Sequence, residues 1–289
     1  FVTVCETGSM TAAASQLFIA KPSISLAISE MEEYYGVKLF DRISRKLYLT
    51  ENGRRALQYA RHIIDLLDEM EQGVRDVDAM GRLKVGTSIT IGTYLLPGYI
   101  KRLKQQYPAL KVEASIANSE TIEQQILDNE IDVGIIEGVA HSHFILSESF
   151  AGDRLAFICP AGHEFAGRTL EELAEVRNQD FILREKGSAG REIFDGILAA
   201  QELNVRPIWQ SASNQVILQG VKAGLGISIL PYFLVRQGIR EGELAEFRIK
   251  GLALNRKYSV IYHKNKFLPR SARTLMELCK EENGTARGL

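Results

Sequence analysis

The pattern of hydrophobic positions changes character at about residue 81. Before that point, apolar residues recur every three or four positions, which is the spacing of one face of a helix. After it, short apolar runs alternate with helical segments, a pattern typical of a parallel sheet with helices on its faces. The pattern therefore predicts an N-terminal part built from helices, followed by a larger α/β part.

Residues 9–33 predict two helices separated by a tight break. The side chains of Ala12, Ala13 and Ala14 are small, so another helix can approach them closely. Pro22 stands where the second helix would begin, a position that tolerates its missing N–H. The apolar residues that fall on one side of the pair are Leu17, Ile24, Ile28 and Met31.

The outward positions of the second helix favour contact with DNA. They are small, hydroxyl-bearing or basic, and they are Lys21, Ser23, Ser25, Leu26 and Ser29. A helix that lies in a DNA groove presents this kind of surface. An ordinary helical hairpin explains the segment equally well when it is considered alone.

A basic turn follows the helix pair. Residues 41–50 place alternating apolar residues on either side of Arg42, Arg45 and Lys46, which predicts a small β-ribbon, or wing. These three cations could reach phosphates beside the groove. A solvated turn can also be basic, so the ribbon supports DNA binding chiefly because it follows the helix pair.

Residues 50 to about 79 predict one long helix, which Thr50 can cap. At about 1.5 Å per residue it would be roughly 40 Å long. Its apolar seam comprises Leu57, Ala60, Ile64, Leu67, Met70, Val74 and Val77. A seam of this length needs a partner, for which we expect the same helix of a second subunit. Packing against the following domain of the same chain is the alternative.

The α/β part is predicted from alternating short segments. The expected strands are 83–86, 111–116, 132–136, 155–160, 181–183, 205–210, 226–231 and 257–262. The expected helices are 95–107, 121–129, 190–203, 214–223 and 269–282. No short-period repeat and no low-complexity segment interrupts them.

Residues 1 to about 53 resemble the winged helix-turn-helix of the LysR-type transcriptional regulators. The segments that carry the resemblance are residues 1–2, 8–14, 22–25, 31–32, 36–42 and 49–53, together with Leu17 and Ile28. Two departures stand out. Lys21 replaces the usual Gln, which puts the usual base preference in doubt, and Ala20 replaces the Ser or Thr that usually caps the recognition helix. Loss of that cap could cost about 1 kcal/mol.

The resemblance continues into the effector-binding domain of the same family, which is similar in fold to type 2 periplasmic solute-binding proteins. It is carried by residues 83–86, 94–97, 132–135 and 219–231. It implies a DNA-binding domain over 1–53, a linker and dimerisation helix over 54–81, and an effector-binding domain over 82–289. The implied lobes are 82–160 with 264–289 and 161–263, so the chain would cross near Pro160 and return near His263. The family most often forms tetramers, as dimers of dimers.

Four polar helix starts are expected at the carboxyl ends of the strands, where ligands of open parallel sheets gather. Backbone N–H groups and hydroxyls at a helix N-terminus can hold an anion, and an Arg can pair with a carboxylate or sulfate. The residues predicted to contact an effector are Ser88, Thr90, Ser119, Ser188, Arg191 and Asn214. Simple N-capping is the alternative for each hydroxyl, but four starts that converge on one cleft favour a small anionic ligand.

Composition narrows the function further. The net charge is −1, so DNA contact must come from local placement of charge. No window approaches the roughly 18 apolar residues that span a bilayer. Three scattered cysteines suit a reducing cytoplasm. The chain begins with Phe1, and we expect the start of its first helix to be missing.

We find no motif for an enzyme. A metal triad, a nucleophile elbow, a Walker loop and a full dinucleotide fingerprint are all missing. We therefore expect no catalytic residue, metal or cofactor, and we expect surface or structural roles for His141 and His143.

The sequence predicts a cytoplasmic, ligand-responsive regulator that binds double-stranded operator DNA. The residues predicted to contact DNA are Thr11, Lys21, Pro22, Ser23, Ser25, Leu26, Ser29, Arg42, Arg45 and Lys46. Expected partners are a second copy through the linker helix, a small anionic effector and, as a further candidate, RNA polymerase. Two alternatives remain: a ligand-independent architectural DNA-binding protein, and a solute-binding protein.

Overall fold

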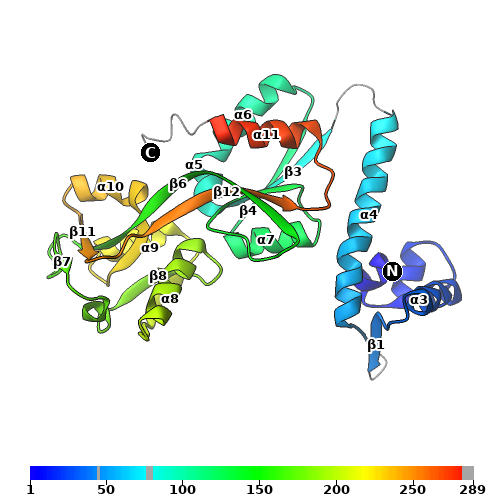
Figure 1. Ribbon diagram of the computed structural model, residues 1–289, viewed down its shortest axis with the longest axis horizontal. Coiled ribbons are helices and arrows are strands. Elements are labelled where there is room, and N and C mark those ends of the chain that lie inside the picture. The colour runs from blue at the N-terminus through cyan, green and yellow to red at the C-terminus, as the bar shows by residue number, and fades with distance from the viewer. Residues whose placement is uncertain (44–45, 76–80, 282–289) are drawn as a thin grey trace. The chain divides into compact units, whose positions relative to one another are not determined.

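The computed structural model describes residues 1–43, 46–75 and 81–281; the side chains at 46, 69 and 71–75 are not described. Contacts divide the chain into two compact units: residues 1–79 with 127–129, and residues 80–126 with 130–289. Figure 1 shows the elements of both units. Within the described residues, no helix is long and apolar enough to cross a bilayer.

The N-terminal unit contains a small helical domain followed by one long helix. Its elements are α1 (Val2–Thr7), α2 (Met10–Gln16), α3 (Lys21–Tyr35), β1 (Phe40–Ile43), β2 (Lys46–Leu49) and α4 (Glu51–Arg75). The buried core comprises Val4, Met10, Ala13, Ala14, Ile24, Ile28, Leu39 and Phe40. The predicted helix pair is confirmed, except that Leu17 caps the C-terminus of α2 and is 44% exposed.

Local capping explains where these helices begin and end. The Ser9 hydroxyl accepts a hydrogen bond from the Ala12 N–H at the start of α2, and Thr50 does the same for the Gly53 N–H at the start of α4. Gly36 ends α3 in the left-handed conformation at φ 65°. Ala20 gives α3 no side-chain cap, as its methyl group requires.

The predicted wing is confirmed as an antiparallel pair. Phe40 lies opposite Leu49 and Arg42 opposite Leu47. The carboxylate of Glu32 anchors the approach to the wing, because it accepts hydrogen bonds from the N–H groups of Leu39 and Phe40 at 2.9 and 3.3 Å. Burial opposes the lowering of the Glu32 pKa, but these bonds and that from Lys38 outweigh it.

Helix α4 exposes apolar side chains along its length. Exposed members of the predicted seam are Ile64, Leu67 and Met70, at 45, 50 and 57%. Ile63 is also exposed, at 65%, although the seam did not include it. The side chain of Val74 and all of Val77 lie outside the described residues, as does the predicted end of the helix at residue 79.

The second unit is built on an eight-stranded mixed sheet. Its strand order is β4-β3-β5-β12-β6-β11-β7, and β10 also pairs with β6. The strands are β3 (Arg82–Ser88), β4 (Lys111–Ala117), β5 (Val133–Glu137), β6 (Ile145–Pro160), β7 (Thr169–Leu170), β10 (Ser228–Pro231), β11 (Leu244–Ile249) and β12 (Asn255–His263). A separate parallel pair comprises β8 (Phe181–Arg184) and β9 (Pro207–Ser211).

Helices cover this sheet. They are α5 (Ile89–Tyr94), α6 (Leu96–Gln106), α7 (Ser119–Leu127), α8 (Ala189–Ala200), α9 (Asn214–Lys222), α10 (Tyr232–Arg240), α11 (Arg270–Glu281) and the 3-10 helix η1 (Leu173–Val176). The helix predicted over 95–107 is α6, whereas α5, α10, β7 and β11 were not predicted. Pro97 lies in the first turn of α6, where its missing N–H is tolerated.

The second unit has two main apolar cores, which define its two lobes. Phe150 and Tyr258 belong to the first core, and Leu155 and Leu254 to the second. We therefore use "first lobe" for residues 82–154 and 255–281, and "second lobe" for 155–254. Strands β6 and β12 run past each other where the lobes join (Figure 1).

The observed crossing points differ from the expected ones near Pro160 and His263. Strand β6 pairs with β12 from Ile145 to Arg154, and with β10 and β11 from Leu155 onward. The chain thus changes lobe inside β6 and returns just before Asn255. The sequence pattern predicted only the second half of β6, which is a continuous apolar run. In the first half, residues 146, 147 and 149 are exposed, so that half has no such run.

The cysteines are free thiols in this fold. Cys159 and Cys279 are buried, and Cys5 is partly buried. Burial raises the pKa of Cys5 and Cys159 to about 11. These two thiols therefore stay protonated near neutral pH and are poor nucleophiles.

Candidate functional site

Helix α3 separates a buried apolar side from an exposed polar side. Ile24 and Ile28 are 5 and 2% exposed. The predicted DNA contacts Lys21, Pro22, Ser23, Leu26 and Ser29 are exposed, as is Thr11 on α2, while Ser25 is intermediate. These side chains are thus accessible to a partner as large as DNA.

The wing carries the second group of predicted DNA contacts. Arg42 is exposed on β1. Lys46 belongs to β2, but its side chain lies outside the described residues, and so does all of Arg45.

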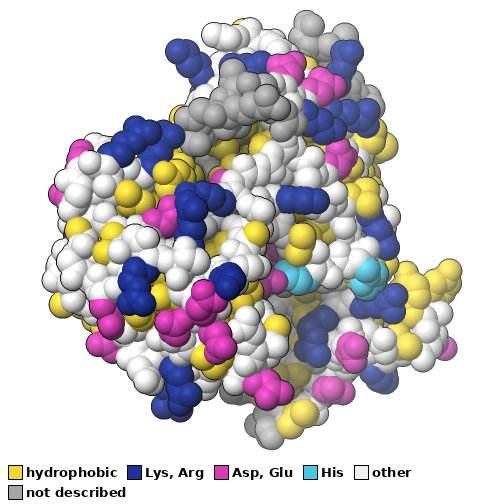
Figure 2. Space-filling view, turned by 60° about the vertical axis from the view of Figure 1, so that its left-hand side comes forward, with side chains coloured by type: hydrophobic (Ala, Val, Ile, Leu, Met, Phe, Trp, Pro, Cys, Tyr) yellow, Lys and Arg dark blue, Asp and Glu magenta, His cyan; other side chains and the backbone are white. Residues whose placement is uncertain are grey.

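On the face shown in Figure 2, basic and acidic side chains are interspersed, which agrees with a net charge of −1.

The first lobe buries three hydroxyl groups where β3 ends and α5 begins. Thr87, Ser88 and Thr90 are 0, 1 and 2% exposed. Their hydroxyl oxygens have no hydrogen-bond partner within the described residues. Ser88 is the N-cap residue of α5 but makes no side-chain cap, so the capping alternative does not hold for it. A buried hydroxyl without a partner costs about 1–3 kcal/mol, which a bound polar ligand would offset.

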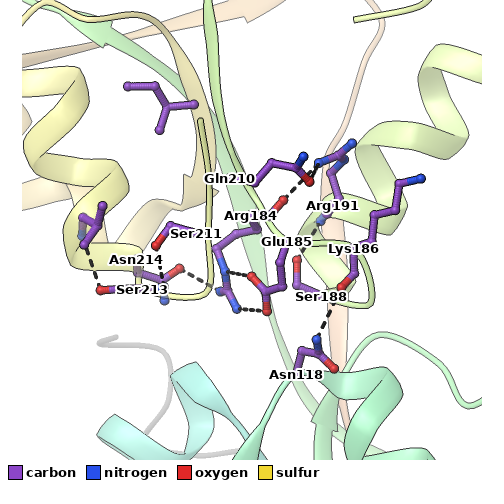
Figure 3. A network of polar contacts seen from close by, with 12 residues as sticks. Asn118, Arg184, Glu185, Lys186, Ser188, Arg191, Gln210, Ser211, Ser213 and Asn214 are labelled. Atoms are coloured by element: carbon purple, nitrogen blue, oxygen red, sulfur yellow. Dashed lines mark hydrogen bonds and ion pairs between the residues drawn. The ribbon is translucent and has the colours of Figure 1, made fainter. Parts of the chain in front are cut away.

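Strand pairing brings these hydroxyls to the edge of the first lobe that meets the second. Ser88 lies opposite Ala117 in the parallel pair of β3 and β4. The next residue, Asn118, donates through Nδ2 to the Lys186 carbonyl of the second lobe at 3.3 Å (Figure 3). The Glu120 N–H donates to the Gly187 carbonyl at 3.1 Å. The two lobes therefore touch beside the buried hydroxyls.

Gly187 is required at this contact between the lobes. Its φ is +85°, a left-handed conformation that L side chains rarely adopt. A Cβ atom there would lie 2.4 Å from a carboxylate oxygen of Glu120. A larger residue would therefore push the loop before α8 away from α7.

Three predicted effector residues are used within the fold. The Ser119 hydroxyl donates to the Glu137 carbonyl at 3.0 Å, and the Ser188 hydroxyl accepts from the Arg191 N–H at the start of α8. The guanidinium of Arg191 contacts Asp195 at 2.8 Å, the Arg184 carbonyl at 3.1 Å and Gln210 at 3.3 Å. Arg191 is only 6% exposed, so it braces α8 against β8 and β9 rather than presenting its charge to a ligand.

Arg184 is the cation that the sequence reasoning missed. It is the last residue of β8, directly after the apolar run Phe181–Leu183, and it is 9% exposed. Its Nη1 donates to Oδ1 of Asn214 at 2.8 Å, and its other two nitrogens bind Glu185 (Figure 3). Asn214, the predicted contact at the start of α9, is thus brought together with Arg184. A cation at the carboxyl end of an apolar strand was the signal in the sequence.

His141 forms a second bridge between the lobes. One ring nitrogen lies 3.3 Å from Glu123 of α7, and the other lies 2.6 Å from Glu192 of α8. The hydrogen bond to Glu192 raises the His141 pKa, burial opposes this, and Glu123 adds to the rise. The predicted structural role of His141 fits these contacts.

A buried ion cluster lies at the point where the lobes join. Arg256 of β12 contacts both oxygens of Asp153 at 2.6 and 2.8 Å, and Glu137 lies 3.4 Å away. Burial alone would lower the Arg256 pKa, but the two carboxylates outweigh it and keep the guanidinium charged. A cavity of about 240 Å³ lies beside this cluster, and Leu95, Tyr99 and Phe150 are among its lining residues. None of the predicted effector residues lines it.

Models of two protein domains match this chain. "Bacterial regulatory helix-turn-helix protein, lysR family" matches residues 1–54, and "LysR substrate binding domain" matches residues 78–284. The transcriptional regulator YeiE of Escherichia coli K12 is 34% identical over 98% of this chain and 96% of its own length.

Solved structures show the same architecture. The regulatory domain of CcmR from Synechocystis, in complex with 2-PG, is 25% identical and has a TM-score of 0.63, covering 70% of this chain and 97% of its own. A full-length variant of OxyR from Pseudomonas aeruginosa is 20% identical, with a TM-score of 0.67 over 96% of this chain and 92% of its own. The two matched domains together span nearly the whole sequence. The chain therefore belongs to the LysR-type family of ligand-responsive, DNA-binding transcriptional regulators.

Proposed function

We propose that a small anionic effector binds between the two lobes and controls DNA reading by α3 and the wing. The observation that carries the effector proposal is the row of buried hydroxyls without partners at Thr87, Ser88 and Thr90. Arg184 and Asn214 would supply the charge and the amide from the second lobe. Ser119, Ser188 and Arg191 would act indirectly, by holding the loops that carry these groups.

DNA contact is assigned to the exposed side of α3. Lys21, Ser25 and Ser29 would approach base edges, and Arg42 would bind a flanking phosphate. Two such units are needed to read two half-sites, and the exposed apolar side chains of α4 support a dimer through this helix. A tetramer of two such dimers, in the cytoplasm, completes the proposal, with RNA polymerase as a further partner.

Effector binding would change the DNA-bound assembly only if the ligand favours one arrangement of the lobes. Coupling between two sites requires different affinities for the two states. The contacts of Asn118 with Lys186 and of His141 with Glu192 join the lobes beside the proposed site. A ligand held by both lobes would stabilise the arrangement in which these contacts are formed. It would thereby shift the equilibrium between the two arrangements of the lobes.

Calorimetry on the full chain tests the effector proposal. Because the CcmR domain was solved with 2-PG, that compound opens a screen of small anions that also contains sulfate and phosphate. Ser88→Ala and Thr90→Ala should each weaken binding of the responding anion by about tenfold, the equivalent of one lost hydrogen bond of about 1.4 kcal/mol. Thr93→Ala is the matched control, since Thr93 is exposed and its hydroxyl donates to the Ile89 carbonyl. Absence of binding by every anion would instead favour a ligand-independent DNA-binding protein.

Footprinting at several salt concentrations tests the DNA assignment. Arg42→Ala should weaken binding to all sequences and reduce the slope of log affinity against log salt by about one. Ser25→Ala should change the protected pattern at the base it approaches. Lys250→Ala removes the same charge in the other unit and should change neither result. An unchanged footprint in both test variants would refute the contact assignment.

A further inference from the structure

The cation of the proposed effector site already has an anionic partner from its own chain. Nε of Arg184 donates to Oε2 of Glu185 at 2.9 Å, and Nη2 donates to Oε1 at 3.0 Å. Together with the bond from Nη1 to Asn214, every nitrogen of this guanidinium is engaged (Figure 3). The edge formed by Nε and Nη2, which could bind an anion through two parallel hydrogen bonds, is therefore already occupied by Glu185.

The geometry of this pair is the one a ligand would use. Two parallel N–H···O bonds between a guanidinium and two oxygens are the preferred way for Arg to bind a carboxylate, phosphate or sulfate. Successive side chains of a strand point to opposite faces. Arg184 and Glu185 can face each other only because β8 ends at Arg184 and the chain turns.

The exposure of the two partners differs in a way that favours exchange. The Arg184 side chain is 10% exposed, so its position is set by the surrounding fold and by Asn214. The Glu185 side chain is 24% exposed, and within the described residues its carboxylate bonds to no side chain other than Arg184. Glu185 can therefore turn towards solvent while Arg184 stays in place.

We propose that Glu185 is an internal counter-ion, which an anionic effector displaces from Arg184. This inference rests on the proposed effector site between the lobes. With no effector, the Glu185 carboxylate neutralises the buried guanidinium. A carboxylate, phosphate or sulfate group of the effector replaces it, keeps Asn214 as a neighbour and receives hydrogen bonds from the hydroxyls of the first lobe. Neutral polar compounds cannot compensate the guanidinium charge, so the exchange selects anions. Competition from Glu185 also sets the anion concentration at which the site becomes occupied.

The test measures anion affinity in the full chain with Glu185 present or neutralised. Acetate, inorganic phosphate and sulfate are titrated separately, so that the three anion classes are distinguished. Glu185→Gln keeps the side-chain shape and removes the competing charge, so it should bind the preferred anion about tenfold more tightly than the parent chain. Glu171→Gln is the matched control, because Glu171 also pairs with a cation, Lys250, but on an exposed surface of the same lobe. It should leave the affinity unchanged.

Two further variants keep the outcome decisive. Arg184→Lys keeps a charge but cannot form the two parallel bonds, and it should lose at least tenfold in affinity. The double variant Arg184→Gln with Glu185→Gln is compared with Arg184→Gln alone. It should bind the anion no more tightly than that single variant. A gain that persists in this double variant would overturn the inference, because it would show that the effect does not pass through Arg184.

The result also separates this inference from the function on which it rests. If the parent chain binds an anion and Glu185→Gln binds it equally or more weakly, Glu185 only orients Arg184 and the counter-ion inference is wrong. If neither the parent chain nor Glu185→Gln binds 2-PG, acetate, phosphate or sulfate while Glu185→Gln retains the parent melting temperature, the anionic effector site fails as a whole.

Discussion

The proposed DNA-reading side of α3 and the proposed effector site between the lobes are both polar, but their side chains differ in burial and pairing. On α3, Lys21, Ser23 and Ser29 are exposed and lie on a helix held by Ile24 and Ile28 behind it. At the proposed effector site, Arg184, Ser119 and Ser188 are at least nine-tenths buried and already bound to other groups of the chain.

We attribute this difference to the different sizes of the two proposed ligands. A DNA groove is a large surface, so the side chains that would contact it can be exposed and hydrated when no DNA is bound. Their exposure does not reduce the stability of the fold. A small effector must be enclosed, and the groups around it become buried polar groups that need partners of their own. Polar groups therefore pair within the cleft, and among its described residues the hydroxyls of Thr87, Ser88 and Thr90 remain without a partner.

The largest effect we expect is on the support of α3. Ile28→Ala should destabilise the N-terminal unit by about 2–5 kcal/mol, because it leaves a cavity in the small core of that unit. DNA binding should be lost, while anion binding by the second unit is retained. Chemical denaturation followed by two separate binding assays measures this. Leu26→Ala, at a position 60% exposed, is the control for the unfolding measurement alone, because Leu26 is itself a predicted DNA contact; its stability should stay within about 0.5 kcal/mol of the parent chain.

A second prediction concerns base choice at the exposed start of α3. Lys21→Gln should change the preferred base at one position of each half-site, with a discrimination of about 1–3 kcal/mol. The physical reason is that Gln can pair with adenine through two hydrogen bonds, whereas Lys favours guanine or a phosphate. Selection from a randomised DNA pool reads out this change. If Lys21 binds only a phosphate, the preferred sequence will stay the same and only the affinity will fall.

At the proposed effector site, removal of a buried hydroxyl should raise the stability of the fold and weaken anion binding. Thr90→Val replaces a buried hydroxyl that has no partner within the described residues with a methyl group of similar size. We expect a gain of about 1 kcal/mol in the free energy of unfolding and weaker anion binding. Thermal unfolding with and without the anion measures both. A loss of stability would mean that the Thr90 hydroxyl is satisfied within the folded chain.

The smallest effect is a dependence of stability on pH at His141. Its pKa is raised in the folded state, chiefly by Glu192, so the contact stabilises fully below the unfolded value of about 6.5. The contribution is lost as the pH rises through the raised value. Since the His141 side chain is 60% exposed, we expect less than about 1 kcal/mol.

Unfolding of the parent chain and of His141→Gln, compared between about pH 5.5 and about pH 8.5, isolates this contribution. The difference between the two proteins should shrink at the higher pH. Glu192→Gln should reduce the same pH dependence, because it removes the larger cause of the raised pKa. A constant difference across this range would show that the charge on His141 does not matter.

The two regions also differ in how far their residues could be predicted. The helix pair, the wing and the long helix were predicted, because each depends on residues close in sequence, such as Ser9 with Ala12 or Thr50 with Gly53. In the cleft, Ser88, Thr90 and Asn214 were singled out, and their role as effector contacts stays a prediction. Arg184 and Thr87 were missed, and Arg191 was assigned to a ligand although its guanidinium holds Asp195 and Gln210.

The sequence by itself determined the family, the order of the domains and most of the helices and strands, because hydrophobic spacing, caps and turns act over a few residues. Only the tertiary structure decided which polar groups are already paired. It put Glu185 on Arg184, Glu192 on His141 and Asp153 on Arg256. The last two pairs join residues far apart in the chain, and the first depends on the turn at the end of β8. Partner choice of this kind follows from how strands and lobes come together, and no local pattern records it.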